Sequence, residues 1–227
     1  MELETSLTST PTARVPNRIQ TNLLARSERR LLNYLCSRLP AWVTPDGLTA
    51  LSFVGALLSF ASYVAARFDP AWLFGASLGL VVYWFGDSLD GSLARHRKIE
   101  RPKYGYFIDH SVDALSNLVL MAGLGLSSFV SLPVALLALI GYYLLGIHVF
   151  ISAYVTDEFK LTFLSAGPTE LRLLLVALNT IMFIAGAQSL NLGGHAVSLY
   201  DAPVGLAALI FLILFLIATI KKARELL

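Results

Sequence analysis

Aspartates recur between residues 87 and 113, in a part of the chain whose neighbours are mostly Leu, Ala, Val and Phe. Asp87 and Asp90 are three residues apart, and Asp109 and Asp113 are four apart, so each pair occupies one face of a helix. Carboxylates crowded in an apolar region repel one another, and the usual remedies are protonation or a divalent cation. The pattern therefore predicts a metal site rather than acids that merely line a loop or bridge helices.

The residues around these acids indicate which metal and which ligand to expect. Oxygen ligands, with at most one histidine expected nearby and no cysteine among them, favour Mg²⁺, Mn²⁺ or Ca²⁺ over zinc. Arg95 lies among the acids and suits a phosphate-bearing ligand. Gly91 and Gly105 have no side chain, so a ligand can approach the helix backbone closely at these positions.

The elements that position these residues are predicted to be membrane helices. The chain has 227 residues, of which 56% are hydrophobic and 14% charged, whereas a soluble domain is about 45–50% apolar and roughly 25% charged. Hydrocarbon excludes irregular backbone, so the predicted fold class is an all-α integral membrane protein. We expect a single domain and no nucleic-acid partner. Runs of about 20 residues suffice to cross a core of ~30 Å. Six such transmembrane helices are predicted, near residues 46–66, 71–94, 104–130, 132–155, 168–188 and 201–220.

The region before the first span divides into two parts. Residues 1–26 are rich in Ser, Thr and Pro and lack the apolar core of a cleaved signal peptide, so we expect a disordered tail. Residues 27–42 have leucines on one helical face with arginines around it, which predicts an interfacial amphipathic helix. The alternative is a polar lead-in to the first span. Residues 43–227 then form the six-helix membrane domain.

Basic residues predict the orientation in the membrane. With a cytoplasmic N-terminus, every Lys and Arg except Arg67 lies on the inner side, as the positive-inside rule favours. We therefore expect both termini and the acidic site in the cytoplasm. The loop between the second and third spans is short, so these helices are predicted to be antiparallel neighbours whose charged faces meet. Arg172 could bind a polar substrate, but an inner-side anchor is the preferred interpretation.

The aspartate pattern resembles the signature of a known family. Residues 87–95 read DSLDGSLAR and residues 105–113 read GYFIDHSVD. This is similar to D-x2-D-G-x2-A-R followed by G-x3-D-x3-D, the signature of the CDP-alcohol phosphotransferases, also called CDP-alcohol phosphatidyltransferases. One departure is the spacer, His96 to Tyr104, which is one residue longer than the usual eight or so. The resemblance implies an enzyme that cleaves the pyrophosphate of a CDP-linked alcohol, releases CMP and transfers the phosphoalcohol group to a hydroxyl.

The resemblance also implies roles for individual residues. Two divalent ions, Mg²⁺ or Mn²⁺, would bind Asp87, Asp90, Asp109 and Asp113. The cytidine nucleotide would lie among Gly91, Ala94, Arg95 and Gly105. The family further implies a homodimer surrounded by membrane lipids, in phospholipid biosynthesis.

Two short segments favour one branch of this family. Residues 107–116, FIDHSVDALS, resemble the FDHxxDxLS of choline/ethanolamine phosphotransferases, and residues 167–170, GPTE, resemble a segment whose glutamate pairs with that histidine. This implies His110 as the general base, Glu170 as its orienting residue and a lipid acceptor such as diacylglycerol or ceramide. Taken alone, His110 could be only a hydrogen-bond partner and Glu170 only a favourable charge at a helix N-terminus.

Other functions stay open at this point. Within the family, the alternative is a CDP-diacylglycerol donor with a soluble acceptor such as glycerol phosphate, inositol or serine, and with Asp113 as the base. Outside it, intramembrane acids also mark ion-coupled transporters, but the chain shows no internal repeat or pair of broken helices. A lipid-binding scaffold without turnover is the third alternative. Release of CMP from a CDP-alcohol distinguishes the enzyme from both.

Overall fold

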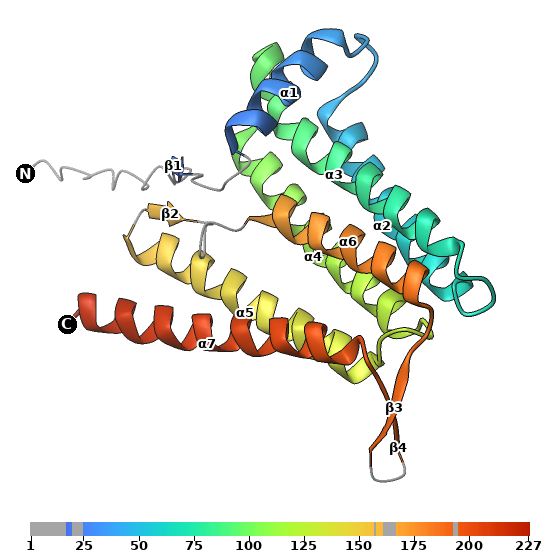
Figure 1. Ribbon diagram of the computed structural model, residues 1–227. Helices are drawn as coiled ribbons and strands as arrows, with labels where there is room; N and C mark the ends of the chain where they lie inside the picture. Colours follow the sequence, from blue (N-terminus) through green and yellow to red (C-terminus); the bar gives the residue numbers. More distant parts are fainter. Residues whose placement is uncertain (1–16, 20–24, 157, 161–166, 193–194) are drawn as a thin grey trace, which may run out of the picture.

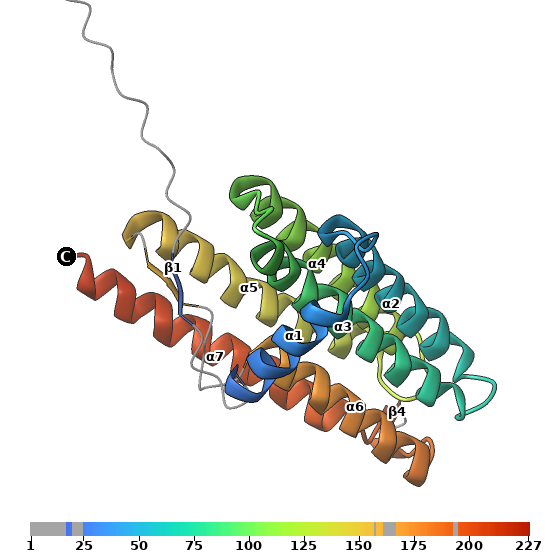
Figure 2. The ribbon, with the colours of Figure 1, turned by 90° about the horizontal axis from the view of Figure 1, so that it is seen from above.

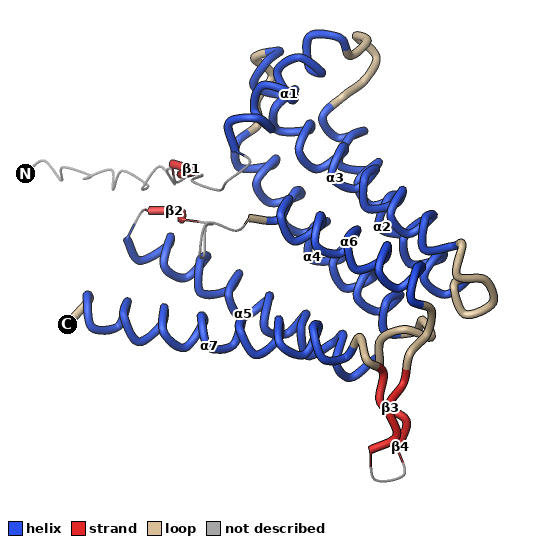
Figure 3. The backbone as a smooth tube through the Cα atoms, in the orientation of Figure 1, coloured by secondary structure: helices blue, strands red, loops and turns tan. Residues whose placement is uncertain are grey.

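The computed structural model describes residues 17–19, 25–156, 158–160, 167–192 and 195–227. Helices dominate this part of the chain, with two small two-stranded sheets beside them (Figure 1). The helices are α1 Ala25–Arg38, α2 Pro45–Ala65, α3 Trp72–Arg97, α4 Pro102–Gly125, α5 Leu132–Thr156, α6 Pro168–Ala185 and α7 Asp201–Glu225. Strands β1 Asn17–Ile19 and β2 Glu158–Lys160 pair in parallel, whereas β3 Ser189–Leu192 and β4 His195–Ser198 form an antiparallel hairpin (Figure 3).

The six predicted spans correspond to α2 through α7, and the all-α membrane class is confirmed. By length and composition, five of the described helices qualify as membrane spans, namely α2, α3, α5, α6 and α7. The remaining predicted span, α4, has 24 residues and includes Asp109 and Asp113. Its crossing of the membrane stays a prediction.

The tightest helix packing joins α2 to α3, through small residues. A Cβ placed on Gly79 of α3 would lie 2.6 Å from the Ser59 backbone nitrogen and 2.7 Å from the Gly55 carbonyl oxygen. The two backbones therefore touch, and only glycine allows this approach. The Ser59 hydroxyl also donates to the Ala76 carbonyl across the contact, at 3.0 Å. This packing fixes the rotation of α3, and with it the direction of the α3 aspartates.

The prediction that the second and third spans are close neighbours was wrong for most of their length. α4 packs along α2, whereas α3 and α4 approach each other at only a few positions (Figure 2). Gly123 of α4 lies against α2, where an added Cβ would be 2.7 Å from the Phe60 Cα. A short loop keeps the connected ends of two helices close together. Along the rest of their length another helix, here α2, can still pack between them.

The N-terminal helix α1 lies across one end of the bundle and packs on α3 (Figure 1). Its Cys36 is buried together with Leu48, Leu89 and Leu93. Leu31 and Tyr34 are exposed on it. α1 ends at Arg38, before the predicted boundary at residue 42. The predicted disordered tail falls largely on residues 1–16 and 20–24, which lie outside the described residues. Its interval 17–19 forms β1, and its last two residues, Ala25 and Arg26, belong to α1. An interfacial position for α1 stays a prediction.

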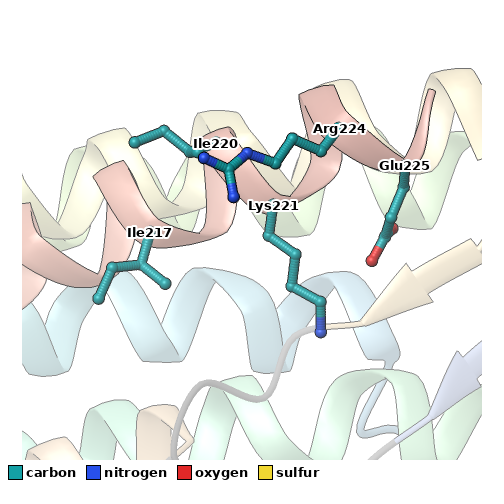
Figure 4. Close-up of a pocket in the computed structure, with 5 residues that line it drawn as sticks. All are labelled: Ile217, Ile220, Lys221, Arg224 and Glu225. Carbon is teal, nitrogen blue, oxygen red and sulfur yellow. The ribbon is translucent and has the colours of Figure 1, made fainter. Parts of the chain in front are cut away.

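The ends of the helices lie at two opposite ends of the bundle. The C-terminal ends of α3, α5 and α7 lie at the same end as α1 and the start of α4 and α6, and the β3–β4 hairpin lies at the other (Figure 1). At the C-terminus of α7 there is an open hollow of about 420 Å³. Its lining comprises Ile217, Ile220, Lys221, Arg224 and Glu225 (Figure 4). Lys221 and Arg224 at this end agree with the predicted excess of Lys and Arg on one side of the membrane.

Candidate functional site

Three of the predicted metal ligands converge between α3 and α4. Carboxylate oxygens of Asp87, Asp109 and Asp113 all lie within 4.8 Å of one another, and all three residues are half-buried. Asp87 comes from α3, whereas Asp109 and Asp113 are one turn apart on the same face of α4. The two charged faces do meet, as the sequence predicted, although the helices that carry them are not packed together along their length.

Asp90, the fourth predicted ligand, is held by α2. Its side chain is buried, and its Oδ2 accepts a hydrogen bond from the Thr49 hydroxyl at 2.6 Å. Its Oδ1 lies 2.5 Å from the backbone nitrogen of Gly91. Asp90 is not among the three acids whose oxygens converge. A metal-binding role for Asp90 stays a prediction.

The cation beside this acidic cluster is Arg172 of α6. Its Nη1 donates to Asp87 Oδ2 at 2.7 Å, and its guanidinium lies over the Tyr83 ring, 4.1 Å from the centroid. Arg172 is only 8% exposed, so the expectation of an anchor at the membrane surface was wrong. A signal was present in the sequence: Arg172 stands between two leucines inside a predicted span, where an unpaired cation is unfavourable.

Tyr83 is a second residue that the sequence analysis missed. It is fully buried, and its hydroxyl lies 3.0 Å from Asp113 Oδ1 and 3.3 Å from Asn117 Oδ1. Its ring supports the guanidinium of Arg172. Tyr83 precedes Asp87 by four residues and so shares its helical face. One aromatic side chain thereby orients both an acid and the cation of the site.

The charges and donor atoms of this cluster suit a divalent cation. Asp87, Asp109 and Asp113 provide three carboxylates, and Arg172 is the cation paired with one of them. Negative charge remains after this pairing, and hard oxygen donors of this kind match Mg²⁺ or Mn²⁺. Mg²⁺ sites in proteins typically combine a few carboxylates with phosphate oxygens of the substrate. The residues present therefore fit a metal-assisted phosphate chemistry.

The four residues predicted to surround a nucleotide lie beside this cluster, on α3 and α4. An added Cβ on Gly105 would meet nothing within 4 Å, so the backbone of α4 is open to a ligand there. The corresponding Cβ on Gly91 would come 3.3 Å from Arg95 Nη1, which places the guanidinium over this glycine. Arg95 is exposed and donates to the Ser92 hydroxyl at 3.3 Å. Ala94 is half-buried.

Other basic residues near Arg95 hold the protein together instead. Arg97 donates to four backbone carbonyls in the segment that joins α1 to α2, including that of Pro40 at 2.8 Å. Arg101 pairs with Asp46 at the start of α2. These contacts fix the loops around the site and leave Arg95 as the exposed guanidinium at the end of α3.

His110 has a defined orientation on α4. Its Nδ1 lies 3.0 Å from the Tyr106 carbonyl oxygen and 3.5 Å from Asp109 Oδ2. Its ring stacks at 4.3 Å on that of Tyr106 and lies 5.4 Å from that of Phe150 on α5. A carbonyl oxygen only accepts hydrogen bonds, so we assign the proton of a neutral imidazole to Nδ1. Nε2 then carries the lone pair that a general base requires.

Glu170 has a structural contact of its own. Its Oε2 accepts a hydrogen bond from the backbone N–H of Gly167 at 2.9 Å, which satisfies a free donor at the start of α6. This contact fits the simpler interpretation, a favourable acid at a helix N-terminus. A role for Glu170 in orienting His110 stays a prediction.

Comparisons with known proteins match this chain to one family and to several of its members. A family model described as CDP-alcohol phosphatidyltransferase matches residues 42–218. Similar curated proteins include cholinephosphotransferase 1 of Danio rerio, 34% identical over 97 residues, covering 40% of this chain and 25% of that protein. Archaetidylinositol phosphate synthase of Pyrococcus horikoshii is 35% identical over 106 residues, covering 46% of this chain and 52% of that protein.

A third relative is phosphatidylinositol phosphate synthase of Cutibacterium acnes, 33% identical over 89 residues, covering 39% of this chain and 40% of that protein. The matched segments thus span between a quarter and about half of the length of these relatives. The relatives include proteins from both branches that the sequence left open.

Removal of Arg172 should destabilise the protein. Arg172→Met keeps much of the side-chain volume but leaves Asp87 without its partner beside two other acids, and breaking a buried pair costs about 3–5 kcal/mol. In detergent with EDTA, we expect the thermal unfolding midpoint to fall by several degrees. Arg67→Met is the matched control, because Arg67 is exposed in the loop after α2. Equal midpoints for the two variants would show that the ion pair contributes nothing.

Proposed function

Because the chain belongs to the CDP-alcohol phosphatidyltransferase family, we propose that it transfers a phosphoalcohol group from a CDP-alcohol to a lipid hydroxyl, with release of CMP. Membership of the family confirms the resemblance drawn from the aspartate signature. The observation that carries the proposal is the convergence of Asp87, Asp109 and Asp113 within the matched residues. Transfer of a substituted phosphate group requires a site of this charge and donor chemistry.

The proposed metal is Mg²⁺ or Mn²⁺, and we propose two ions. Asp87, Asp109 and Asp113 would hold them, with Asp90 as a further ligand. A bound divalent ion would neutralise the pyrophosphate of the donor and favour departure of CMP.

The remaining steps belong to the chain's own side chains. Arg95, exposed at the end of α3, would contact a donor phosphate, and the open backbone at Gly105 would admit the nucleotide beside it. The Nε2 of His110 would take the proton from the attacking hydroxyl, since Nδ1 faces the Tyr106 carbonyl. Arg172 would keep Asp87 in place when no cation is bound.

The preferred donor is a soluble CDP-alcohol, and the preferred acceptor is diacylglycerol or a ceramide-like lipid. The orientation of His110 supports this branch, because Nδ1 faces the Tyr106 carbonyl and Nε2 can then carry the lone pair of a base. The alternative, a CDP-diacylglycerol donor with a soluble alcohol, is supported by the similarity to two inositol phosphate synthases. In that alternative Asp113 takes the proton.

We further propose that both termini and the site face the cytoplasm, and that the protein is a homodimer in phospholipid biosynthesis. Basic residues lie in the last turns of α3 and α7, and these helix ends lie at the same end of the bundle (Figure 1), which supports the orientation. Exposed apolar side chains on α5 and α7, such as Ile147 and Leu209, suit contact with acyl chains or a second copy.

A donor screen tests the function directly. Purified protein with Mg²⁺ or Mn²⁺ should release CMP from CDP-choline, CDP-ethanolamine or a similar donor only when a lipid alcohol is added. Activity should vanish in EDTA and return with the metal. Asp87→Asn and Asp109→Asn should each abolish turnover while the protein still inserts normally. Undiminished CMP release in chelator would contradict the metal assignment, and CMP release only from CDP-diacylglycerol would select the alternative branch.

Substitutions at His110 and Asp113 identify the base. Loss of a general base typically costs 10²–10⁴-fold in rate, so His110→Ala should reduce kcat on that scale and leave donor and metal binding nearly intact. Glu170→Gln should cost less, and the double variant should be little worse than His110→Ala, because residues that act as one unit are not additive. Asp113→Asn should lose metal affinity together with rate. If His110→Ala keeps its kcat while Asp113→Asn is inactive with metal bound, Asp113 is the base.

Single cysteines test the orientation. Native Cys36 is buried, and burial raises the pKa of its thiol, so a Cys36→Ala background removes a thiol that is already slow to react. Ala is preferred to Ser because the site is apolar. Exposed Ile99→Cys should react with an impermeant maleimide only after the cells are permeabilised, and Leu190→Cys should react in intact cells. The reverse labelling pattern would place the site on the outer side.

A further inference from the structure

Glu28, in the first turn of α1, reaches across to two membrane helices. Its Oε1 accepts hydrogen bonds from the Trp84 indole N–H at 2.9 Å and the Ser88 hydroxyl at 3.4 Å, both on α3. The same oxygen accepts from the Thr169 hydroxyl of α6 at 2.8 Å. Hydrogen bonds to an ionised carboxylate are stronger than neutral ones, and all three here are partly buried. One oxygen atom thus connects α1, α3 and α6.

The position of Glu28 in its helix does not explain these contacts. An acid in the first turn favours the helix dipole wherever its side chain points. Attachment of α1 to the bundle does not require them either, because Cys36, two turns further along α1, is buried in a separate apolar cluster against Leu48 and Leu89. The polar contact therefore adds a constraint on α6 that the apolar cluster does not provide.

The residues that contact Glu28 are close in sequence to the ion pair of the site. On α3, Trp84 and Ser88 lie on either side of Asp87. On α6, Thr169 is three residues before Arg172 and therefore on the same side of the helix. Arg172 and Asp87 join α3 to α6 at 2.7 Å. The Glu28 contacts and the ion pair connect the same two helices about one helical turn apart.

We infer that Glu28 is a positioning residue for the active site. Its carboxylate fixes the position of the N-terminal turn of α6 along the axis of α3, at the level where Arg172 contacts Asp87. Glu28 acts through this pair and is not itself a catalytic residue. The kinetic part of the inference rests on the proposed function, whereas the geometric part does not. A misplacement of about 1 Å in a catalytic group is enough to cost roughly 10²-fold in rate.

Kinetics give the first test. Glu28→Ala should lower kcat by roughly 10- to 100-fold and leave the KM for the CDP donor nearly unchanged. Glu28→Gln should retain much of the rate, because its amide oxygen can still accept hydrogen bonds from Trp84, Ser88 and Thr169. Thr169→Val, which removes only the bond to α6, should fall between wild type and Glu28→Ala. The matched control is Asn33→Ala, an exposed polar residue on the same helix, which should behave as wild type.

A distance measurement makes the test independent of activity. In a Cys36→Ala background, spin labels at Asn33→Cys on α1 and Leu173→Cys on α6 occupy exposed positions. The distance distribution between them should broaden with Glu28→Ala and Thr169→Val and stay narrow with Glu28→Gln.

The possible outcomes separate the two proposals. If wild type releases no CMP from any donor but the distribution broadens as expected, the proposed function fails and the positioning role stands. The inference is overturned if Glu28→Ala keeps both the wild-type kcat and a narrow distribution. It is also overturned if Glu28→Ala only reduces the yield of folded protein while the kcat of the folded fraction is unchanged. Should Glu28→Ala not fold, Thr169→Val and Glu28→Gln decide the question by the same two measurements.

Discussion

The ion pair between Asp87 and Arg172 allows a group of carboxylates to exist among apolar helices. A lone ionised carboxylate is strongly disfavoured there, and Asp109 and Asp113 lie within a few ångströms of Asp87. Arg172 supplies a cation at 2.7 Å, and the Tyr83 ring supports the guanidinium from one side. The pairing compensates only part of the negative charge. The remainder is the negative charge that a divalent cation would neutralise in the proposed function.

This requirement explains how α6 is attached to the rest of the molecule. Much of α6 is exposed, as Leu174 and Ile184 show, so apolar packing alone binds it weakly. Polar contacts replace that packing at two levels. Arg172 meets Asp87 on α3, and Asn179, two turns further, accepts from the Tyr63 hydroxyl and donates to Ser77. Directional hydrogen bonds of this kind fix the rotation of a helix and its position along its own axis. Apolar contacts between membrane helices do not, because lipid tails provide similar contacts.

The two helices that carry the acids are held differently. α3 touches α2 backbone to backbone at Gly79, which leaves little freedom for Asp87 to move. α4 packs along α2 but approaches α3 at only a few positions, and its backbone is open at Gly105. The rigid pair of α2 and α3 therefore faces α4, whose backbone is accessible at Gly105. Such an arrangement would keep the proposed metal ligands in place while a nucleotide enters beside them.

The sequence by itself determined the helical membrane class, the approximate positions of the long helices, and the meeting of the acidic faces that brings Asp87, Asp109 and Asp113 together. Hydrophobic run length and helical periodicity are local properties, so the sequence displays them directly. The family also followed from local spacing. Only the tertiary structure showed that Arg172 is the cation of the site, that α2 packs between α3 and α4, and that Glu28 joins α1 to α6. These depend on which helices become neighbours, and residues from three or four separate helices meet at a point that no short segment of sequence contains.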